Sequence, residues 1–242
     1  MKYYSGTVPT CGIYCGSCPQ FGRCKGAICA TKRCGIYKCC VEKRGHRHCF
    51  ECKTFPCSKL GYLAERRVGY GQDIVRNLRL IKELGEPGFF DFYSAQIDLM
   101  RKQADAEHEA IVRRFNDCIN KRNIKGLTAL MTDDHVFVDT AGNRIIGVAD
   151  NRNLAWTPFF ERFPGYRNVF EIVIVNGSRV VIQGYSVCPG SSLDNFRAIW
   201  VAEVSEKKIS LWSIYPDTGK NRKLFGLNPV EPENNQNINH EQ

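Results

Sequence analysis

Hydrophobic residues in the second half of the chain recur with two different periods. Spacings of three and four residues predict three helices, over Ala106–Lys121, Ile124–Met131 and Gly147–Arg162. Runs of β-branched and aromatic residues predict five strands, over His135–Thr140, Asn168–Val175, Arg179–Cys188, Phe196–Val204 and Lys208–Tyr215. Asn176-Gly177 joins two of these strands and is typical of a tight hairpin turn. The last four strands are therefore expected to form an antiparallel meander.

In the first half of the chain, helical spacing appears only after residue 57. Ser58 is a good N-cap for a short helix, and Gln72–Leu84 has apolar residues at helical spacing, with Gly85 as the C-cap. Gly88–Asp91 is predicted as a turn and Tyr93–Gln103 as a further helix. Before residue 57, the density of Gly and Cys predicts loops and short turns.

These patterns divide the chain into three parts. We predict a cysteine-rich domain with a helical extension at residues 1–104, a second domain at 105–228 and a disordered tail at 229–242. The tail is assigned as disordered because it is polar, rich in Asn and poor in apolar residues. With 242 residues, of which 43% are hydrophobic, the chain can bury a sizeable core.

Cysteine is concentrated in one stretch: eleven of the thirteen cysteines lie between Cys11 and Cys57. Such a concentration has three common causes, which are disulfides, zinc and an iron–sulfur cluster. The first residues, MKYYSGTVPT, contain no apolar stretch typical of a secretory signal, so we expect a cytoplasmic protein and disfavour disulfides. No apolar run is long enough to span a bilayer, so no membrane partner is expected.

The spacing of the cysteines favours a metal. Cys15–Cys18 and Cys49–Cys52 are two CxxC pairs, and two such turns can complete a tetrahedral zinc site. His46 and His48 precede the second pair and could replace a thiolate, but we favour their assignment to a solvated basic loop. The candidate zinc ligands are Cys11, Cys15, Cys18, Cys24, Cys34, Cys39, Cys40, Cys49, Cys52 and Cys57.

An iron–sulfur cluster remains the alternative cofactor. Cys11-x3-Cys15-x2-Cys18 has the spacing of radical S-adenosylmethionine enzymes, but the alternating strands and helices that those enzymes need do not follow it. A plain cluster held by four of the cysteines, in a redox or sensor protein, stays open.

The positive charge of the chain lies in its cysteine-rich part. Residues 1–70 carry 13 Lys and Arg and 3 Asp and Glu, a balance of 13 − 3 = +10, whereas the whole chain carries +9. These cations could bind nucleic-acid phosphates or could offset the charge of metal-bound thiolates. We favour the second explanation, because the basic residues are scattered singly between cysteines and few aromatic residues accompany them.

The second domain resembles the SnoaL-like, nuclear-transport-factor-2-like superfamily. The resemblance spans Asp105–Leu227 and rests on FNDCINKRNIKGLTALMTDDHVFVDTAG, FFERFPGYRN and EVSEKKISLWSIYPD. It implies a cone-shaped α+β barrel, in which three helices accompany a curved antiparallel sheet and a pocket opens at the wide end. It also implies that a homodimer through the outer face of the sheet is possible. The whole chain is thus expected to be α+β, with an irregular metal-binding module before the cone.

The first domain is similar to a cysteine-rich family of unknown function whose members read CGxYCGxCP and then CxxCxxFPC. The matching residues here are Cys11, Cys15, Cys18, Pro19, Cys49, Cys52, Phe55, Pro56 and Cys57. This resemblance implies zinc binding and no particular activity.

The resemblance to the cone superfamily also implies candidate catalytic residues. Asp139 stands where the steroid-isomerase branch has its general base, and strand alternation places His135 on the same face. If that face lines an apolar pocket, the pKa of Asp139 should be raised. The oxyanion donors of that branch are missing, because Phe115 has no hydroxyl and neither Ile199 nor Trp200 has a carboxyl group. Steroid-isomerase chemistry is therefore not favoured.

The function predicted from sequence is a metal-binding protein with a cone that binds an unknown small molecule. An enzyme of the isomerase, dehydratase or cyclase type is an alternative, and nucleic-acid binding by the basic module is another. The candidate ligand-binding residues of the cone are Trp156, Phe160, Tyr185, Trp200, Tyr215 and Asp217.

Overall fold

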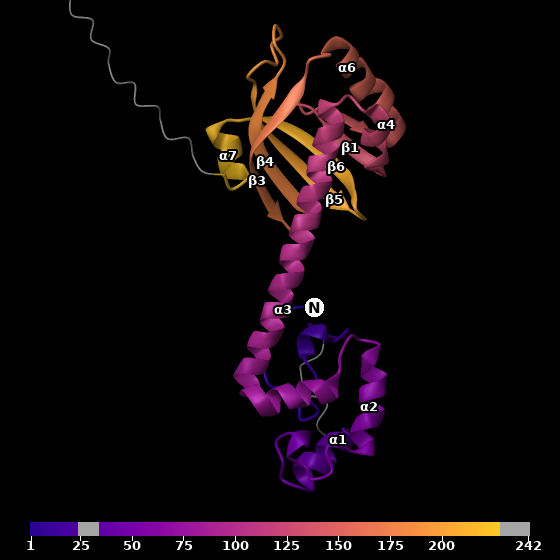
Figure 1. The fold of residues 1–242 in the computed structure, drawn as a ribbon, viewed down its shortest axis with the longest axis vertical. Helices are drawn as coiled ribbons and strands as arrows, with labels where there is room; N and C mark the ends of the chain where they lie inside the picture. Colours follow the sequence, from indigo (N-terminus) through magenta and orange to yellow (C-terminus); the bar gives the residue numbers. More distant parts are fainter. Residues whose placement is uncertain (24–33, 228–242) are drawn as a thin grey trace, which may run out of the picture. The chain divides into compact units, whose positions relative to one another are not determined.

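The computed structural model describes residues 1–23 and 34–227 of the chain. The chain forms two compact units, Met1–Arg101 and Lys102–Gln242, which we call unit 1 and unit 2 and describe separately (Figure 1). The division falls inside the long helix α3 (Ile74–Asn120), as does the predicted boundary between residues 104 and 105. The predicted tail and the candidate ligand Cys24 lie outside the described residues.

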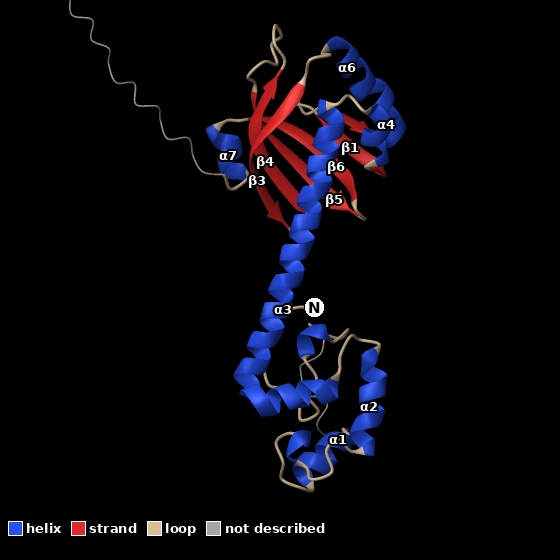
Figure 2. Cartoon of the chain, viewed as in Figure 1, coloured by secondary structure: helices blue, strands red, loops and turns tan. Residues whose placement is uncertain are grey.

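Unit 1 is built from short turns and two longer helical segments (Figure 2). Its described elements are η1 (Cys15–Ser17), α1 (Gly35–Tyr37), η3 (Lys38–Glu42), η4 (Cys49–Glu51), α2 (Ser58–Val68) and the first part of α3. Gly85 has φ 71° and ψ 174°, so it ends one helix before the next begins, as its predicted role as C-cap requires. The predicted turn at Gly88–Asp91 is wrong, because Pro87 falls in the first turn of the second helix, where proline favours a helix.

The cysteine-rich segment of unit 1 rests on an apolar core. The rings of Tyr14 and Tyr93 stack with their centroids 3.9 Å apart and their planes 3° apart. Gln72 brackets Tyr14 through two hydrogen bonds to its backbone, of 2.8 and 2.9 Å, and Asn77 donates to the carbonyl of Gly12 at 2.8 Å. Gly12 and Tyr14 belong to no strand or long helix, so these buried side-chain amides supply hydrogen-bond partners for their backbone groups. The module is therefore irregular, as predicted, but α3 gives it a core of its own.

Unit 2 is a curved six-stranded sheet with helices at its ends and across one face (Figures 1 and 2). The sheet order is β2-β1-β6-β5-β4-β3. The strands are β1 (Met131–Val138), β2 (Arg144–Ile146), β3 (Arg167–Asn176), β4 (Arg179–Val187), β5 (Arg197–Ser205) and β6 (Lys208–Pro216). The helices after α3 are α4 (Ile124–Ala129), α5 (Val148–Asp150), η5 (Asn151–Trp156), α6 (Thr157–Arg162) and α7 (Gly219–Leu224).

The sheet is mixed, which corrects the expectation of an antiparallel sheet. Strands β3 to β6 form the predicted antiparallel meander, but β1 runs parallel to β6, with a register shift between Met131 and Val136. The edge strand β3 carries a second irregularity, between Phe170 and Ile172. Alternation of apolar residues predicts a strand but contains no information on the direction of a partner far away in sequence.

The two faces of the sheet bury different residues. On the inner face, Trp200 and Trp212 belong to the main core together with Phe115 of α3. On the outer face, Val181 and Ile199 form a smaller cluster, against which Tyr215 and Phe225 pack. Since side chains of a strand alternate between faces, the sheet separates an aromatic interior from a second, smaller apolar layer next to α7.

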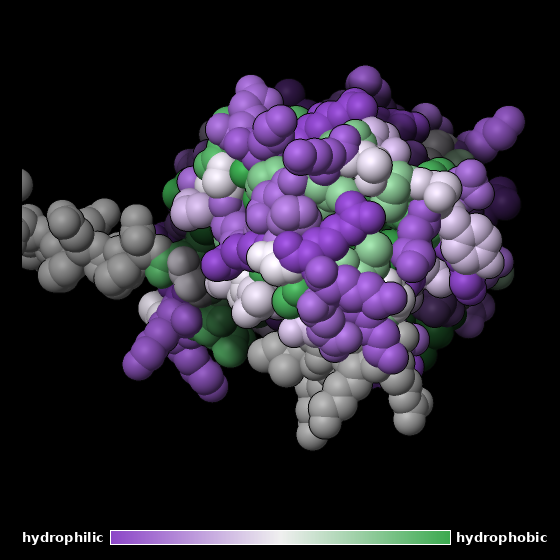
Figure 3. Space-filling view, turned by 90° about the horizontal axis from the view of Figure 1, so that it is seen from below, coloured by the Kyte–Doolittle hydropathy of each residue, from purple (hydrophilic) through white to green (hydrophobic). Residues whose placement is uncertain are grey.

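The face of the molecule drawn in Figure 3 is largely hydrophilic. In the part of the chain drawn in colour in Figure 3, hydrophobic areas are small and are separated by hydrophilic side chains, as is usual for protein surfaces in water. Within residues 1–23 and 34–227, no helix is both long enough and apolar enough to cross a membrane.

Candidate functional site

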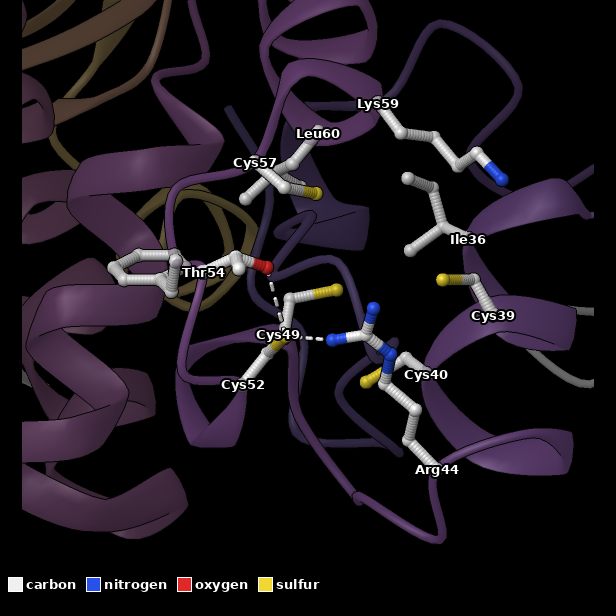
Figure 4. Close-up of a pocket in the computed structure, with 11 residues that line it drawn as sticks. Ile36, Cys39, Cys40, Arg44, Cys49, Cys52, Thr54, Cys57, Lys59 and Leu60 are labelled. Carbon is white, nitrogen blue, oxygen red and sulfur yellow. Dashed lines mark hydrogen bonds between the residues drawn. The ribbon is translucent and has the colours of Figure 1, made fainter.

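Five cysteines of unit 1 line one small pocket (Figure 4). Cys39 and Cys40 belong to η3, Cys49 and Cys52 stand at the two ends of the second CxxC turn, and Cys57 is the N-cap of α2. The pocket has a volume of about 50 Å³. Since one water molecule needs about 10–15 Å³ of such space, the pocket suits an ion and a few atoms better than a large organic molecule.

The two CxxC motifs fold in the same way. In each, the last cysteine donates its backbone N–H to the carbonyl of the first, over 3.0 Å for Cys15–Cys18 and 3.2 Å for Cys49–Cys52. The last cysteines also have nearly equal dihedral angles, φ −76° and ψ 134° at Cys18 and φ −75° and ψ 134° at Cys52. Such a tight turn directs two thiols of one motif to the same side, as metal-binding CxxC turns require.

The thiols of the pocket differ in electrostatic environment. Burial raises the pKa of Cys49, and the charge of Cys40 beside it raises this pKa further. Hydrogen bonds from Thr54, together with the nearby guanidinium of Arg44, lower the pKa of Cys52. Figure 4 shows the guanidinium of Arg44 pointing toward Cys52, with their hydrogen bond as a dashed line. The pocket therefore combines buried thiols with a cation that stabilises a thiolate.

Other predicted metal ligands lie near the pocket or apart from it. Cys11 belongs to the same apolar core of unit 1 as Cys40 and Cys49, and Cys34 packs against that core. Cys15 and Cys18 flank η1 and are not among the residues that line the pocket. In the described part of the chain, no three His, Cys, Asp or Glu side chains are placed to hold one ion.

The histidine that precedes the second CxxC motif has a structural role. His48 is 4% exposed, and its Nε2 atom lies 2.9 Å from a carboxylate oxygen of Glu86. Its backbone N–H donates to Glu51 at 2.9 Å, which caps the turn at η4. The prediction of a solvated loop is therefore wrong for His48, and its Nδ1 atom is buried without a hydrogen-bond partner among the described residues.

A second candidate site lies in the interior of unit 2, where aromatic rings surround one histidine. The ring of Phe115 is 5.9 Å from that of His135, 6.3 Å from that of Trp156 and 4.9 Å from that of Trp212. Phe160 adds a ring 5.6 Å from Trp156. Each of these side chains is at most 6% exposed, so the interior is closed to water in this conformation.

The state of His135 follows from one hydrogen bond. Its Nδ1 atom lies 2.8 Å from the carbonyl oxygen of Ile209, which can only accept, so Nδ1 carries the proton. Burial lowers the pKa of His135 to about 4, which keeps the ring neutral at physiological pH. The Nε2 atom is then an unprotonated acceptor, and it has no hydrogen-bond partner among the described residues.

The indole N–H groups of the interior are also unpaired. Trp156, Trp200 and Trp212 each bury this donor without a partner in the described part of the chain. An indole N–H can only donate, whereas Nε2 of His135 can only accept. The interior therefore offers both kinds of hydrogen-bonding group in apolar surroundings.

Asp139 is placed differently from the prediction. It follows β1 and accepts hydrogen bonds from the backbone N–H of Ala141 at 2.8 Å and of Asn143 at 2.9 Å, so it holds the turn into β2. Burial alone would raise the pKa of Asp139, but these bonds and the side-chain amide of Asn143 outweigh burial and lower it. The predicted rise in the pKa of Asp139 is therefore wrong, because hydrogen bonds from the residues of its own turn stabilise the carboxylate.

The structure brings only some of the predicted cone residues together. Trp156, Phe160 and Trp200 lie in the inner core, whereas Tyr185 packs beside Arg197 and Tyr215 beside Phe225. The carboxylate of Asp217 is 1% exposed and pairs with Arg222 at 2.5 and 2.7 Å. It also accepts from Gln183 at 3.0 Å. Asp217 thus anchors α7 to the sheet.

Sequence reasoning missed several polar residues beside the two sites. In unit 2, Asn168 joins β3 to α3 by donating to Asn116 at 3.0 Å, and its own backbone N–H donates to Asn120 at 2.7 Å. In unit 1, Arg44 and Thr54 reach Cys52. No sequence motif predicts a role for these asparagines. Arg44 and Thr54, by contrast, lie close in sequence to the second CxxC pair, and this proximity could have identified them as residues of the pocket.

The match to a known protein family lies in the second half of the chain. A family model described as a SnoaL-like domain matches residues 112–212. Comparison with curated proteins gives no match. The resemblance of the cysteine-rich region to its family is not shown by these matches and stays a prediction.

Several solved structures are similar. An NTF2-like protein of unknown function from Cytophaga hutchinsonii is 16% identical and covers 49% of this chain and 94% of its own, with a TM-score of 0.38. An NTF2-like protein of unknown function from Burkholderia pseudomallei is 15% identical, with coverages of 49% and 96% and a TM-score of 0.40. An LEH-like epoxide hydrolase of M. tuberculosis is 21% identical, with coverages of 47% and 84% and a TM-score of 0.40.

We transfer no activity from proteins at these identities and TM-scores. The second half of the chain has an α+β arrangement, in which a long helix lies against a curved mixed sheet. What the comparisons support is thus a likeness of residues 112–212 to a SnoaL-like domain.

Proposed function

We propose that unit 2 binds a small organic molecule inside its cone. The observation that carries this proposal is that unit 2 buries seven side-chain polar atoms without a partner in the described residues. They are Nε2 of His135, the indole nitrogens of Trp156, Trp200 and Trp212, Oγ1 of Thr132, and Oδ1 of Asn151 and of Asn168. A buried polar group that stays unpaired costs about 1–3 kcal/mol. Since most buried polar groups in folded proteins are paired, a bound molecule is a reasonable source of the missing partners.

The SnoaL-like character of residues 112–212 supports the same proposal, because the cone of that family suggests a site for small molecules. Isomerisation, dehydration or cyclisation would further need a group that moves a proton. Asp139 is held in a turn, so His135 is the better candidate for such a step. Catalysis is the alternative function, and binding is the one that the geometry supports best.

Tryptophan fluorescence tests the binding proposal directly. The chain has three tryptophans, and all of them lie in the interior of unit 2. A panel of neutral aromatic compounds should contain members that change this fluorescence saturably and stabilise the chain, by about 2.7 kcal/mol at one hundred times Kd. Binding that persists when Trp156 and Trp212 are both replaced by Phe would place the site elsewhere.

We also propose that unit 1 binds a metal ion through its thiols, on a separate observation. Five cysteines line one pocket of about 50 Å³, and Arg44 and Lys59 line it too. Thiolates suit zinc, and they also suit an iron–sulfur cluster. Cations beside the pocket would offset the negative charge of several thiolates around one ion. The ten cysteines predicted from the sequence remain the candidate ligands, with Cys24 outside the described residues.

Anaerobic purification followed by metal quantitation tests this second proposal. We expect zinc or iron in stoichiometric amount, and a visible absorption band only if iron and sulfide are present. Cys49→Ser should lower the metal content, whereas the matched control Cys118→Ser, in unit 2, should not. Protein that carries neither metal and binds no added Zn²⁺ would refute the proposal. Cytoplasmic location, a homodimer through the sheet and nucleic-acid binding remain predictions.

A further inference from the structure

We infer that the exposed face of α2 in unit 1 binds single-stranded nucleic acid, whose bases stack on tyrosine rings and whose phosphates contact neighbouring cations. The rings are those of Tyr62 and Tyr70, and the cations are Lys59, Arg66 and Arg67. This inference goes beyond both proposed functions, because it concerns neither the interior of unit 2 nor metal binding by the thiols.

Helical spacing decides which side chains of α2 face outward. Leu60 is fully buried, and Ala64, four residues later, packs against the same apolar core of unit 1. Lys59, Tyr62 and Arg66 are spaced by three and four residues, so they share the opposite face of the helix. In Figure 1, α2 stands at the edge of unit 1. One helix face therefore presents a ring between two cations.

The tyrosine rings of this region are open to a partner. Tyr62 and Tyr70 are 65% and 43% exposed. The guanidinium of Arg66 lies 5.8 Å from the ring centroid of Tyr62, and that of Arg67 lies 5.3 Å from the ring centroid of Tyr70. A guanidinium covers only one face of a ring, so the other face can stack with a base. Bases of a duplex already stack on one another, so such rings favour a single strand.

The cations of α2 have no carboxylate partner in the part of the chain that the structure describes. None of Lys59, Arg66 and Arg67 forms an ion pair there. The carboxylates of Glu51 and Glu86 pair instead with the basic residues that precede the second CxxC motif. Cations that are not neutralised within the protein attract a polyanion.

Thiolates around a metal ion would not neutralise all of these cations. Lys59 lines the thiol pocket, but Arg66 does not, and it lies about 10 Å further along the helix axis. Salt screens charges in water over about 8 Å. An acidic peptide would pair with the cations but leave the rings of Tyr62 and Tyr70 without a stacking partner, whereas a single strand uses both.

The fold also changes the conclusion that the sequence favoured. Among the cysteines, the basic residues are scattered singly, but α2 begins after the last of these cysteines, Cys57, which is its N-cap. There the helix gathers cations and rings that look unrelated in the sequence.

Fluorescence anisotropy of labelled oligonucleotides titrated with the full chain tests this inference. The probes are oligothymidylate and oligouridylate of about 12 nucleotides, which lies within the usual length of a single-strand site, and a duplex of the same length. Binding through phosphates alone has a Kd of about 10⁻⁴–10⁻⁶ M, so the protein is titrated to about 100 µM. We expect the single strands to bind at least tenfold more tightly than the duplex. Three cations predict a slope of about −2 for the logarithm of the binding constant against that of salt concentration.

Variants separate stacking from charge. Tyr62→Ala should weaken binding about tenfold, or about 1.4 kcal/mol, without changing the salt slope, and Tyr62→Trp should keep the affinity. Arg66→Gln should make the slope shallower by about 0.7. The matched controls are Tyr3→Ala and Arg101→Gln, which alter a second tyrosine–arginine pair of unit 1, where the hydroxyl of Tyr3 already donates to Asp98. Both controls should bind as the unaltered chain does.

Several outcomes would overturn the inference. These are duplex binding as tight as that of the single strands, a Tyr62→Ala variant that binds unchanged, and no binding up to about 100 µM. A polyglutamate peptide or phosphatidylserine vesicles that bind more tightly than the oligonucleotides and displace them would assign this face to an acidic protein or to a membrane instead. Binding of only one of the two single strands would support the inference and identify the partner as DNA or RNA. Metal content and tryptophan fluorescence, which test the proposed functions, are measured independently.

Discussion

The Nδ1 atom of His135 donates to the carbonyl oxygen of Ile209 over 2.8 Å, across 74 residues of sequence. The bond joins β1 to β6 where their register shifts, between Met131 and Val136. At such a shift the backbone ladder leaves groups unpaired, and here a side chain supplies the missing donor. The same bond fixes the proton of His135 on Nδ1 and leaves Nε2 as a buried acceptor without a partner among the described residues.

The first prediction concerns the pH dependence of the stability of unit 2. Burial lowers the pKa of His135 to about 4 in the folded chain, against 6.5 for the free side chain. The unfolded chain then binds a proton between these pH values that the folded chain does not. Stability should therefore be full above pH 6.5 and should fall toward pH 4, by about 3 kcal/mol from this residue.

Urea unfolding at pH 7 and pH 4.5, followed by tryptophan fluorescence, measures this loss. His135→Gln should flatten the dependence, because glutamine does not titrate. The partly exposed His108, whose ring contacts the carbonyl of Gly177, provides the matched control His108→Gln, which should keep the slope of the unaltered chain. An equal slope in all three proteins would contradict the prediction.

The second prediction concerns Asp217, a candidate ligand residue in the sequence. Asp217→Asn should destabilise unit 2 by roughly 3 kcal/mol, because Arg222 would lose its partner at a buried pair. Ligand binding in the folded fraction should not change. The exposed pair of Glu171 and Arg197 is the control: Glu171→Gln should cost at most about 1 kcal/mol in the same urea experiment.

The placement of Asp217 and Tyr215 shows what the sequence could have revealed. Trp212 and Tyr215 are three positions apart in one strand, so they cannot share a face of the sheet. Once Trp212 is assigned to the inner face of the sheet, strand alternation alone assigns Tyr215 to the outer face. By contrast, Trp156 and Phe160, which the sequence placed in one predicted helix and among the candidate ligand-binding residues, both lie in the core. Periodic signals of this kind depend only on neighbours in sequence.

Other features depend on contacts that no local pattern contains. The parallel pairing of β1 with β6 is set by where the chain returns after the helices and the meander. The gathering of Cys39, Cys40 and Cys57 around the second CxxC turn depends likewise on how η3 and α2 pack. For Asp139, the sequence suggested an apolar surrounding, whereas the turn residues Ala141 and Asn143 supply hydrogen bonds. Such outcomes are decided by tertiary structure.

The third prediction concerns Gly184 in β4. A Cβ atom at this position would lie 2.0 Å from the carbonyl oxygen of Val169 in β3, beside the irregularity at Phe170. Gly184→Ala should therefore force the two strands apart and destabilise unit 2 by about 3 kcal/mol. Urea unfolding measures the effect. Gly165→Ala, where the added atom meets nothing within 4 Å, is the control and should be nearly neutral; equal losses in both variants would refute the explanation.

The fourth prediction concerns removal of the metal from unit 1. If the thiol pocket binds an ion, chelation should make the bonds around η3 and η4 sensitive to protease, since the binding energy of the ion is part of the folding energy. The tryptophan fluorescence of unit 2 should not change, because all three tryptophans lie there. Mass spectrometry of the fragments locates the cuts. Protease resistance that is unaltered by chelation would contradict this prediction and would indicate that the apolar core around Tyr14 and Tyr93 keeps unit 1 folded without an ion.

The irregularity in β3 has a consequence for association between molecules. As the last strand of the sheet, β3 has one edge that no other strand of the described residues pairs with, and its Ile172 and Ile174 are 45% and 40% exposed. A foreign strand could extend the sheet only along an even ladder. The shift after Phe170 interrupts that ladder, so the edge can carry two exposed isoleucines and still discourage growth of the sheet into fibrils.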